Sequence, residues 1–281
     1  MSPKASSSGS RRKAKKFRPT MAERADRHVL YEEAVQCSEA EIDFVDKTFI
    51  ELRGRRAKWL REDFCGTANS ACEWVRRRRS NHAIGVDLDA DVQQWGRKHH
   101  IAALGPASKR IELVNANVLK VDCARVDVVL AMNFSYWIFK DRKLLFRYFR
   151  AVHKGLGPDG LFILDAYGGS DAHQEMSEET EHHTFNYVWN QERYDPITGA
   201  FLCHIDFTFP DGSCIKRAFT YDWRLWSLPE IREIFLEAGF KRVTVYWEGT
   251  DEETGEGNGE YTPAEHGEAD TAFIVYIVAE K

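Results

Sequence analysis

The sequence predicts an α/β protein in which a doubly wound, mostly parallel sheet carries an inserted antiparallel β-meander. Three observations lead to this prediction. Residues 57–89 have the pattern of a strand, a tight turn that opens a helix, and a second strand that ends at Asp87. Residues 126–132 are apolar apart from Asp127, as expected of a central parallel strand buried on both faces. Residues 184–223 alternate aromatic and polar side chains between turns, which is typical of antiparallel strands.

The composition is that of a globular protein and indicates no overall nucleic-acid surface, with 43% hydrophobic residues, 30% charged residues and a net charge of −5. The six cysteines include no C-x-x-C pair, which favours a reduced, cytoplasmic setting. No stretch approaches the roughly 18 apolar residues of a membrane span, and the first residues lack the apolar segment of a signal peptide. We therefore expect no association with a membrane.

The N-terminal part of the chain divides into a basic tail and a helical segment. Residues 1–19 hold seven Lys or Arg residues and no acidic residue, so we expect a disordered tail. A solvated tail is the simpler interpretation, and a basic arm for RNA or a localisation signal is the alternative. Residues 20–54 predict two helices, of which the second begins with a capping box of Ser38 and Glu41. These helices are expected to pack on the sheet and to close a ligand pocket.

The turn after the first strand has the features of a nucleotide-binding loop. Gly66 lets the backbone approach a ligand closely, and the N–H groups that open the next helix face that ligand. Asp87 follows about 20 residues later, where an acidic residue at a strand end can accept hydrogen bonds from ribose hydroxyls. A dinucleotide would need G-x-G-x-x-G, whereas the chain from Phe64 onwards keeps one glycine of the three. The sequence therefore favours a nucleoside-containing cofactor other than a dinucleotide.

This loop resembles motif I of the class I S-adenosylmethionine (SAM) methyltransferases, in which an acidic residue precedes x-G-x-G-x-G. Glu62 matches the acidic residue and Gly66 matches the central glycine. Phe64 and Ala68 stand where the family has its outer two glycines, so the chain departs from the motif at these positions. The resemblance implies that the cofactor is SAM.

The resemblance covers residues 31–167 and 223–280 in the family's order, and it implies a seven-stranded Rossmann-like sheet that ends in an antiparallel pair, residues 243–247 and 272–278. Between this pair, residues 250–270 carry eight acidic residues and four glycines. We expect a long acidic loop there, which serves as a lid or a partner surface or is disordered. The expected segments are a basic tail at 1–19, N-terminal helices at 20–54, an α/β core at 55–183, a meander at 184–223 and the remainder of the core at 224–281.

The apolar strand is followed by Asn133, Phe134, Ser135 and Tyr136, which resemble motif IV of the same family. The N-P-P-Y form of that motif holds an exocyclic amine, although both prolines are absent here. The resemblance implies that Asn133 and Tyr136 are catalytic residues that orient the acceptor, with Tyr167 as a further wall of its pocket. A structural alternative is that Asn133 and Ser135 cap the next helix.

The resemblance also implies which residues contact SAM. Asp87 matches the residue that binds the ribose, Asn117 matches the acidic residue that binds the adenine amino group, and Tyr31 matches an aromatic residue over the methionine end. Tyr31 is equally well explained as an ordinary half-buried helix residue. The full set of expected cofactor contacts is Tyr31, Glu62, Phe64, Cys65, Gly66, Thr67, Ala68, Asp87, Leu88, Asn117, Val118 and Asn133.

Together these features predict SAM-dependent methyl transfer to a small-molecule acceptor, and they favour an amine. The insertion at 184–223 resembles the acceptor cover of small-molecule N-methyltransferases. One alternative is an RNA methyltransferase that uses the basic tail, and another is a non-catalytic SAM-binding or interaction protein, which the altered glycine loop would explain. We expect no metal site, because the histidines show neither H-x-x-x-H spacing nor a His/Cys pairing.

Overall fold

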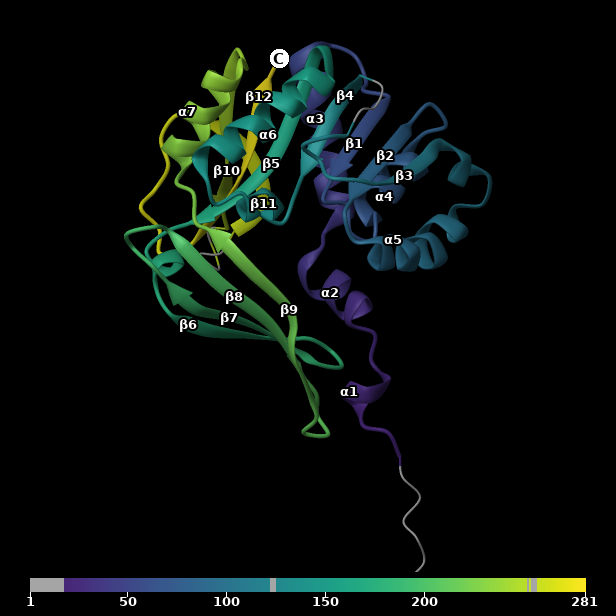
Figure 1. Ribbon diagram of the computed structural model, residues 1–281, viewed down its shortest axis with the longest axis vertical. Coiled ribbons are helices and arrows are strands. Elements are labelled where there is room, and N and C mark those ends of the chain that lie inside the picture. Colours follow the sequence, from purple (N-terminus) through teal and green to yellow (C-terminus); the bar gives the residue numbers. More distant parts are fainter. Residues whose placement is uncertain (1–17, 122–124, 252, 254–256) are drawn as a thin grey trace, which may run out of the picture.

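The computed structural model of the protein describes residues 18–121, 125–251, 253 and 257–281. These residues form an eight-stranded main sheet and a separate four-stranded antiparallel sheet (Figure 1). The basic tail expected at 1–19 lies almost wholly outside the described residues. The α/β class, the mostly parallel sheet and the antiparallel insertion are confirmed.

Five neighbouring strands of the main sheet run parallel in the order β3-β2-β1-β4-β5, which is a doubly wound arrangement. Helices follow β1, β2 and β4 and lead to the next strand, and because the five strands are parallel their carboxyl ends meet at one edge of the sheet. The strands are β1 (Trp59–Asp63), β2 (His82–Asp87), β3 (Ile111–Asn115), β4 (Val126–Ala131) and β5 (Leu156–Gly168), and the helices between them are α4 (Asn69–Arg77), α5 (Ala90–Gly96), η1 (Arg97–Ile101), η2 (Ala102–Arg110), η3 (Ser135–Ile138) and α6 (Arg142–Gly155).

The other end of the main sheet is antiparallel. Strand β12 (Phe273–Glu280) lies between β5 and β10 (Arg242–Thr250), and β11 (Gly257–Ala264) pairs with the outer side of β10. The sheet therefore has one strand more than the seven expected, because part of the region expected as an acidic loop at 250–270 is strand β11. The ring of Tyr261 packs at 4.3 Å from the ring of Tyr276, and this cross-strand contact holds β11 on the sheet.

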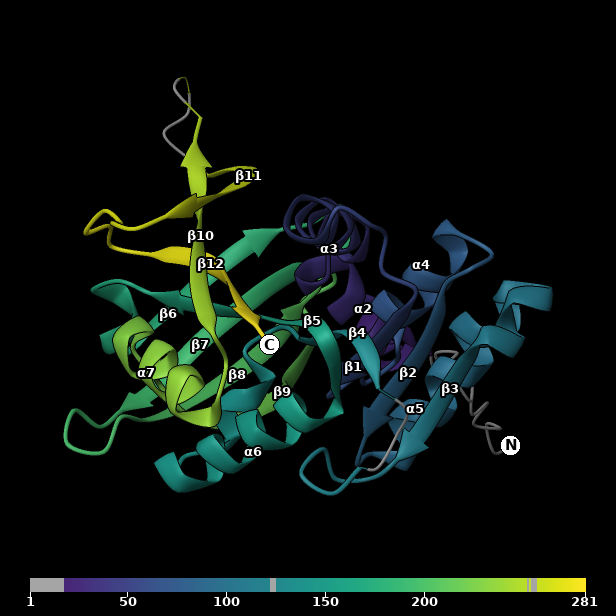
Figure 2. The ribbon, with the colours of Figure 1, turned by 90° about the horizontal axis from the view of Figure 1, so that it is seen from above.

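Helices cover both faces of the main sheet (Figure 2). On one face, α3 (Ser38–Arg53) and α4 pack against alternate residues of the central strands, including Leu161 and Ile163 of β5. On the other face, α6 and α7 (Leu228–Ala238) pack against Phe162 and Leu164. The continuous apolar pattern of the central strands follows from this burial on both faces.

The N-terminal segment contains three helices, α1 (Met21–Arg24), α2 (Arg27–Val35) and α3, where two were expected. Asp26 separates the first two, because its side chain accepts the backbone N–H of His28 and caps α2. The expected capping box of α3 does not form. The carboxylate of Glu41 instead accepts the hydroxyl of Ser70 at 2.8 Å and ties α3 to α4 in the interior.

The second sheet follows β5 in the chain and has four strands, one more than the three extended runs expected. Strand β6 precedes the predicted meander and pairs with β7 along its whole length. The four strands are β6 (Met176–Glu181), β7 (Asn186–Tyr194), β8 (Ala200–Thr208) and β9 (Cys214–Arg224). Figure 1 shows this sheet below the main sheet, with α1 and α2 beside it.

Candidate active site

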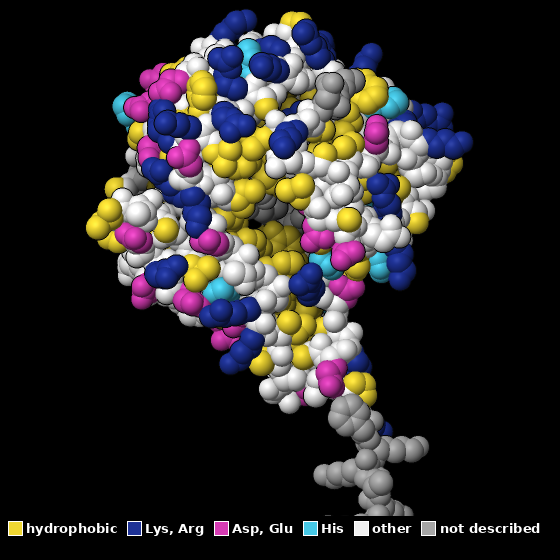
Figure 3. All heavy atoms as spheres, in the orientation of Figure 1, with side chains coloured by type: hydrophobic (Ala, Val, Ile, Leu, Met, Phe, Trp, Pro, Cys, Tyr) yellow, Lys and Arg dark blue, Asp and Glu magenta, His cyan; other side chains and the backbone are white. Residues whose placement is uncertain are grey.

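Two cavities meet between the carboxyl edge of the parallel strands and the second sheet. The glycine-loop cavity, of about 310 Å³, lies against the turn between β1 and α4. The aromatic cavity, of about 420 Å³, lies against the inner face of the second sheet. A hollow lined by hydrophobic side chains is visible between the two parts of the molecule (Figure 3). Four residues line both cavities, and they are Tyr31, Asn133, Tyr221 and Trp223.

The glycine loop has one glycine, but its backbone has the conformation that glycine favours at all three positions of the motif. Phe64, Gly66 and Ala68 have φ values of 57°, 50° and 61°, so all three alternate positions are left-handed. This conformation costs a non-glycine residue about 1 kcal/mol or more. The ring of Phe64 packs against those of Phe139 and Tyr148, and this packing helps to hold it there. Phe64 and Ala68 therefore have the backbone conformation that glycine favours.

Asp87, at the end of β2, is hydrogen-bonded to the backbone of the glycine loop. One of its carboxylate oxygens accepts the backbone N–H of Gly66 at 2.8 Å, and the other accepts the N–H of Asp89 at 2.8 Å. A carboxylate oxygen has two lone pairs, so each retains capacity for a further donor. Asp87 also lines the glycine-loop cavity, where ribose hydroxyls could be such donors.

Buried acidic groups lie beneath this loop. The carboxylate of Glu62 accepts the backbone N–H of Ala71 at 2.9 Å, and burial raises its pKa to about 8. Burial also raises the pKa of the Cys65 thiol well above its usual value. Both residues line the glycine-loop cavity. At neutral pH the Cys65 thiol is therefore protonated and unreactive.

Four of the expected cofactor residues do not reach the glycine-loop cavity. Ala68 and Val118 are buried in hydrophobic packing, whereas Leu88 is exposed. Asn117 uses its side-chain oxygen to accept the backbone N–H of Leu119 at 2.9 Å, which closes a local turn. The expected contacts that do line this cavity are Tyr31, Glu62, Phe64, Cys65, Gly66, Thr67, Asp87 and Asn133.

Asn133 lies at the junction of the two cavities. Asn133 and Phe134 both have a φ of 56°, so the chain leaves β4 through two successive left-handed residues. Their backbone N–H groups donate to the two carboxylate oxygens of Asp165, at 2.7 and 2.9 Å. Asp165 is buried, and its burial raises its pKa to about 7. This carboxylate on β5 thus holds the backbone that presents Asn133.

The helix-capping alternative for this turn is wrong. The following helix, α6, is capped by Asp141, whose side chain accepts the N–H of Leu144 at 3.0 Å. Ser135 donates its hydroxyl to the carbonyl of Met132 at 2.8 Å, and the short helix η3 has no side-chain cap. Asn133 is therefore not engaged in capping.

The expectation that Tyr136 orients the acceptor is also wrong. The helix η3 turns Tyr136 into the core, where it is fully buried and lines neither cavity. Its hydroxyl donates to the backbone carbonyl of Asp165 at 2.9 Å. Tyr167, by contrast, lines the aromatic cavity and donates its hydroxyl to the side chain of Gln191.

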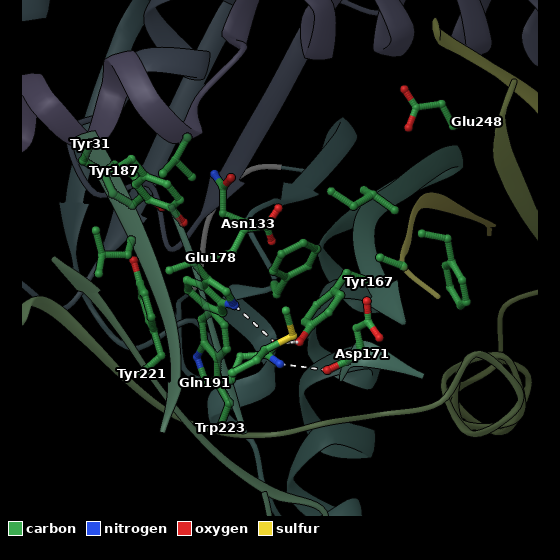
Figure 4. Close-up of a pocket in the computed structure, with 18 residues that line it drawn as sticks. Tyr31, Asn133, Tyr167, Asp171, Glu178, Tyr187, Gln191, Tyr221, Trp223 and Glu248 are labelled. Carbon is green, nitrogen blue, oxygen red and sulfur yellow. Dashed lines mark hydrogen bonds between the residues drawn. The ribbon is translucent and has the colours of Figure 1, made fainter. Parts of the chain in front are cut away.

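Five residues of the aromatic cavity wall are alternate residues of β7 and β9, which project from one face of the second sheet. Tyr187, Trp189 and Gln191 come from β7, and Tyr221 and Trp223 come from β9 (Figure 4). Gln191 is buried and donates to the backbone carbonyls of Asp171 and Gln174 at 2.8 and 2.9 Å. It also accepts the indole N–H of Trp189 at 3.3 Å, so it fixes the positions of its neighbours.

The tyrosine hydroxyls of this wall are poor bases. The side chains of Tyr31 and Tyr221 are hydrogen-bonded to each other, and burial raises the pKa of both phenols. Burial likewise raises the pKa of Tyr167 and Tyr187. These four groups remain protonated at neutral pH, so they can orient an acceptor but cannot remove its proton.

Three carboxylates line the aromatic cavity, and the sequence analysis identified none of them. Asp171 accepts the side-chain amide of Gln174 at 3.1 Å, and Glu248 accepts the backbone N–H of Gly259 at 2.9 Å. The side-chain carboxylate of Glu178 is exposed and has no hydrogen bond or ion pair within the described part of the chain. The register of β6 on β7 places it beside Trp189.

Within residues 18–121, 125–251, 253 and 257–281, no group of three or more His, Cys, Asp or Glu side chains is placed to hold a metal ion. No helix among these residues is both long and apolar enough to cross a membrane.

No family model and no curated protein matches this sequence. Solved structures do match. A SAM-dependent methyltransferase from Clostridium acetobutylicum superposes with a TM-score of 0.66 at 14% identity, over 90% of this chain and 96% of that chain. The SAM-bound amino pentose methyltransferase of Micromonospora echinaspora gives 0.63 at 14% identity, over 90% and 95%. A sugar N-methyltransferase from a Streptoalloteichus species gives 0.61 at 15% identity, over 98% and 99%. The protein therefore has the fold of the class I SAM-dependent methyltransferases.

Proposed function

We propose that this protein transfers a methyl group from SAM to an amine of a small-molecule acceptor. The observation that carries the proposal is the meeting of the glycine-loop cavity and the aromatic cavity at Asn133. A methyl donor in the first cavity and an acceptor in the second would react at this junction. The similar structures are named as methyltransferases of an amino pentose and of a sugar nitrogen, which agrees with the proposal.

The glycine-loop cavity offers groups suited to SAM. Asp87 has free lone pairs for ribose hydroxyls, and the Glu62 carboxyl offers negative charge to a cationic ligand when it is ionised. The left-handed φ values of Phe64, Gly66 and Ala68, in the region that glycine favours, support the enzyme over the non-catalytic alternative. SAM would supply an electrophilic methyl group that needs no further activation.

The aromatic cavity offers groups suited to an amine. Glu178 is a carboxylate without a hydrogen-bond partner among the described residues, and a charged ammonium group is its natural complement. The rings of Tyr221 and Trp223 add faces that attract cations. Once the ammonium group has lost a proton to solvent, Asn133 lies where its side-chain oxygen can accept an N–H of the neutral amine and direct the nitrogen lone pair toward the donor cavity. The contribution of the protein is thus chiefly alignment.

A calorimetric titration with SAM and with S-adenosylhomocysteine tests the donor half of the proposal, and we expect binding of both. Methyl transfer to a panel of amine metabolites tests the acceptor half. If neither SAM nor S-adenosylhomocysteine binds, the whole proposal is overturned. Binding without transfer to any amine of the panel would overturn the acceptor assignment alone.

The substitution Glu178→Gln tests recognition of the amine. We expect KM for a cationic acceptor to rise about tenfold while the affinity for SAM stays unchanged, because the charge-assisted pair is lost. Glu181→Gln is the matched control, because Glu181 lies on the same strand, where alternation places its side chain on the opposite face. An equal effect of both substitutions would show that Glu178 acts only through the net charge of the surface.

A further inference from the structure

We propose that the acceptor has two parts and that a second site, next to the aromatic cavity, holds an uncharged ring-containing group of the acceptor beyond its amine. This inference rests on the proposed function and extends it to the size and chemistry of the substrate. We call this second site the rear cavity. It lies between the end of β5, the turn from β7 to β8, and the segment that joins β9 to α7.

The rear cavity adjoins the aromatic cavity directly. Its volume is about 470 Å³, which is similar to that of the aromatic cavity. Tyr167 and Phe273 line both cavities, so these two rings form the boundary between them. A small amine would fill only the first cavity. A molecule that passes these rings would occupy both.

The walls of the rear cavity favour a ring without charge. Arg224 of β9 lines this wall, and its guanidinium group forms an ion pair with the carboxylate of Glu230 at 2.9 Å. Its guanidinium group lies 3.7 Å from the ring centre of Trp226. A guanidinium group in such a stack, together with the rings of Tyr167 and Tyr194, offers flat surfaces for another ring. Because Arg224 and Glu230 neutralise each other, this pair offers no unpaired charge to an ionic ligand.

The rim of the rear cavity also carries features that a ligand would use. Ile197 lines the cavity and is 92% exposed, which is an unusual position for a large apolar side chain. A ring that entered the cavity would cover part of this surface and gain from its burial. The hydroxyl of Thr198 is already engaged, because its oxygen accepts the backbone N–H of Ala200 at 3.2 Å and the side chain is hydrogen-bonded to Asp195. The apolar and aromatic side chains of this wall would therefore recognise the ligand, and a neutral carbohydrate ring or an aromatic ring would satisfy them.

The experiment compares one-ring and two-ring amines that share the same aminated end. Glucosamine is paired with lactosamine, and benzylamine is paired with 4-phenylbenzylamine. Each is titrated by calorimetry into the full-length protein saturated with S-adenosylhomocysteine, so that the measurement does not depend on turnover. We expect the two-ring member of at least one pair to bind about tenfold more tightly than its partner, from the extra apolar surface buried. A preference in the sugar pair identifies a carbohydrate, and a preference in the aryl pair identifies an aromatic group.

The substitution Ile197→Asp tests whether the gain arises in the rear cavity. We expect it to reduce the two-ring advantage at least threefold and to leave the one-ring affinity unchanged. Leu236→Asp is the matched control, because Leu236 is an exposed leucine of α7 that lines none of the three cavities.

The outcomes separate this inference from the proposed function. Equal affinities within both pairs would overturn the inference and leave the proposed function intact. An equal loss in Ile197→Asp and Leu236→Asp would overturn the assignment to the rear cavity. Binding of none of the four amines, with S-adenosylhomocysteine still bound, would overturn the inference together with the amine assignment.

Discussion

The carboxylate of Asp165 accepts the backbone N–H of Asn133 at 2.7 Å. A residue of β5 thus holds the residue that follows the neighbouring strand β4. The second carboxylate oxygen accepts the N–H of Phe134 at 2.9 Å. Both donors belong to left-handed residues, a conformation that non-glycine residues adopt only when their surroundings impose it. The position of Asn133 at the junction of the cavities therefore depends on Asp165.

The substitution Asp165→Asn should lower kcat about tenfold or more and change the affinity for SAM less than threefold. An amide has one accepting oxygen, so one of the two backbone N–H groups would lose its partner and the turn would relax. Steady-state kinetics and calorimetry together measure this difference. Equal losses of kcat and of SAM affinity would mean that Asp165 serves the fold as a whole.

The pH dependence of the same group provides a second readout. Burial raises the pKa of Asp165 to about 7, so the folded protein holds this proton more tightly than the unfolded chain does. The free energy of unfolding should therefore decrease between pH 4 and pH 7 because of this group, and Asp165→Asn should lack that decrease. Activity should rise through about pH 7, where the carboxylate becomes able to accept both N–H groups. Denaturant unfolding and pH–rate profiles of the two proteins check these expectations.

The affinity for SAM should increase with pH up to about 8. The pKa of Glu62 is raised to about 8 by burial, and a bound cation favours the ionised carboxylate, so binding should release a proton below that pH. Calorimetry in buffers with different ionisation enthalpies measures this proton directly. S-adenosylhomocysteine, which lacks the sulfonium charge, should show a shallower dependence. A pH slope that persists in Glu62→Gln would assign the proton to another group.

The substitution Ala68→Gly should leave the affinity for SAM within about threefold of the parent, because the backbone at Ala68 already has the conformation of a glycine. Relief of the left-handed strain should offset most of the lost methyl packing and the added chain entropy, so stability should change little. Ala71→Gly is the control, since Ala71 is a buried residue of α4 with helical backbone. This substitution should lower the free energy of unfolding by about 1 kcal/mol. A gain in affinity of tenfold or more in Ala68→Gly would reveal that the alanine methyl group obstructs the loop.

The substitution Tyr136→Phe should reduce the free energy of unfolding by about 1 kcal/mol and change kcat less than twofold. The hydroxyl of Tyr136 makes a buried hydrogen bond to the backbone of Asp165 and contacts neither cavity. Tyr167→Phe should instead alter the KM of the acceptor, because Tyr167 lines the aromatic cavity and binds Gln191. A large loss of kcat in Tyr136→Phe with unchanged stability would return this tyrosine to the active site.

The order of strands and the location of the site could be predicted from the sequence because both depend on local patterns. Gly66, Asp87 and Asn133 each follow or end a strand of the parallel set, and the carboxyl ends of such strands share one edge. Their convergence therefore follows from topology. The direction of Tyr136 does not, because it is set by the short helix η3 and by a hydrogen bond to a residue 29 positions away.

Other features depend on pairings that no local pattern records. Glu178 lies in the run Ser177–Glu181 of polar and acidic residues, which is typical of a solvated segment, and only the register of β6 on β7 turns it toward the cavity. Strand β11 forms by antiparallel pairing with β10, and its Tyr261 packs against Tyr276 of β12, which follows later in the chain. The role of Asp165 becomes visible only when β4 and β5 lie side by side.

The second sheet leaves the main sheet after β5 and returns to it at α7, so residues 169–227 form one uninterrupted segment of the chain. This segment supplies Trp189, Tyr221 and Trp223 to the acceptor side, whereas the glycine loop and Asp87 lie far upstream. A single exchange of this segment between related proteins would replace nine of the eighteen residues that line the aromatic cavity and would leave the glycine loop unchanged. Under the proposed function, recombination of one continuous segment could therefore change the acceptor without changing the donor site.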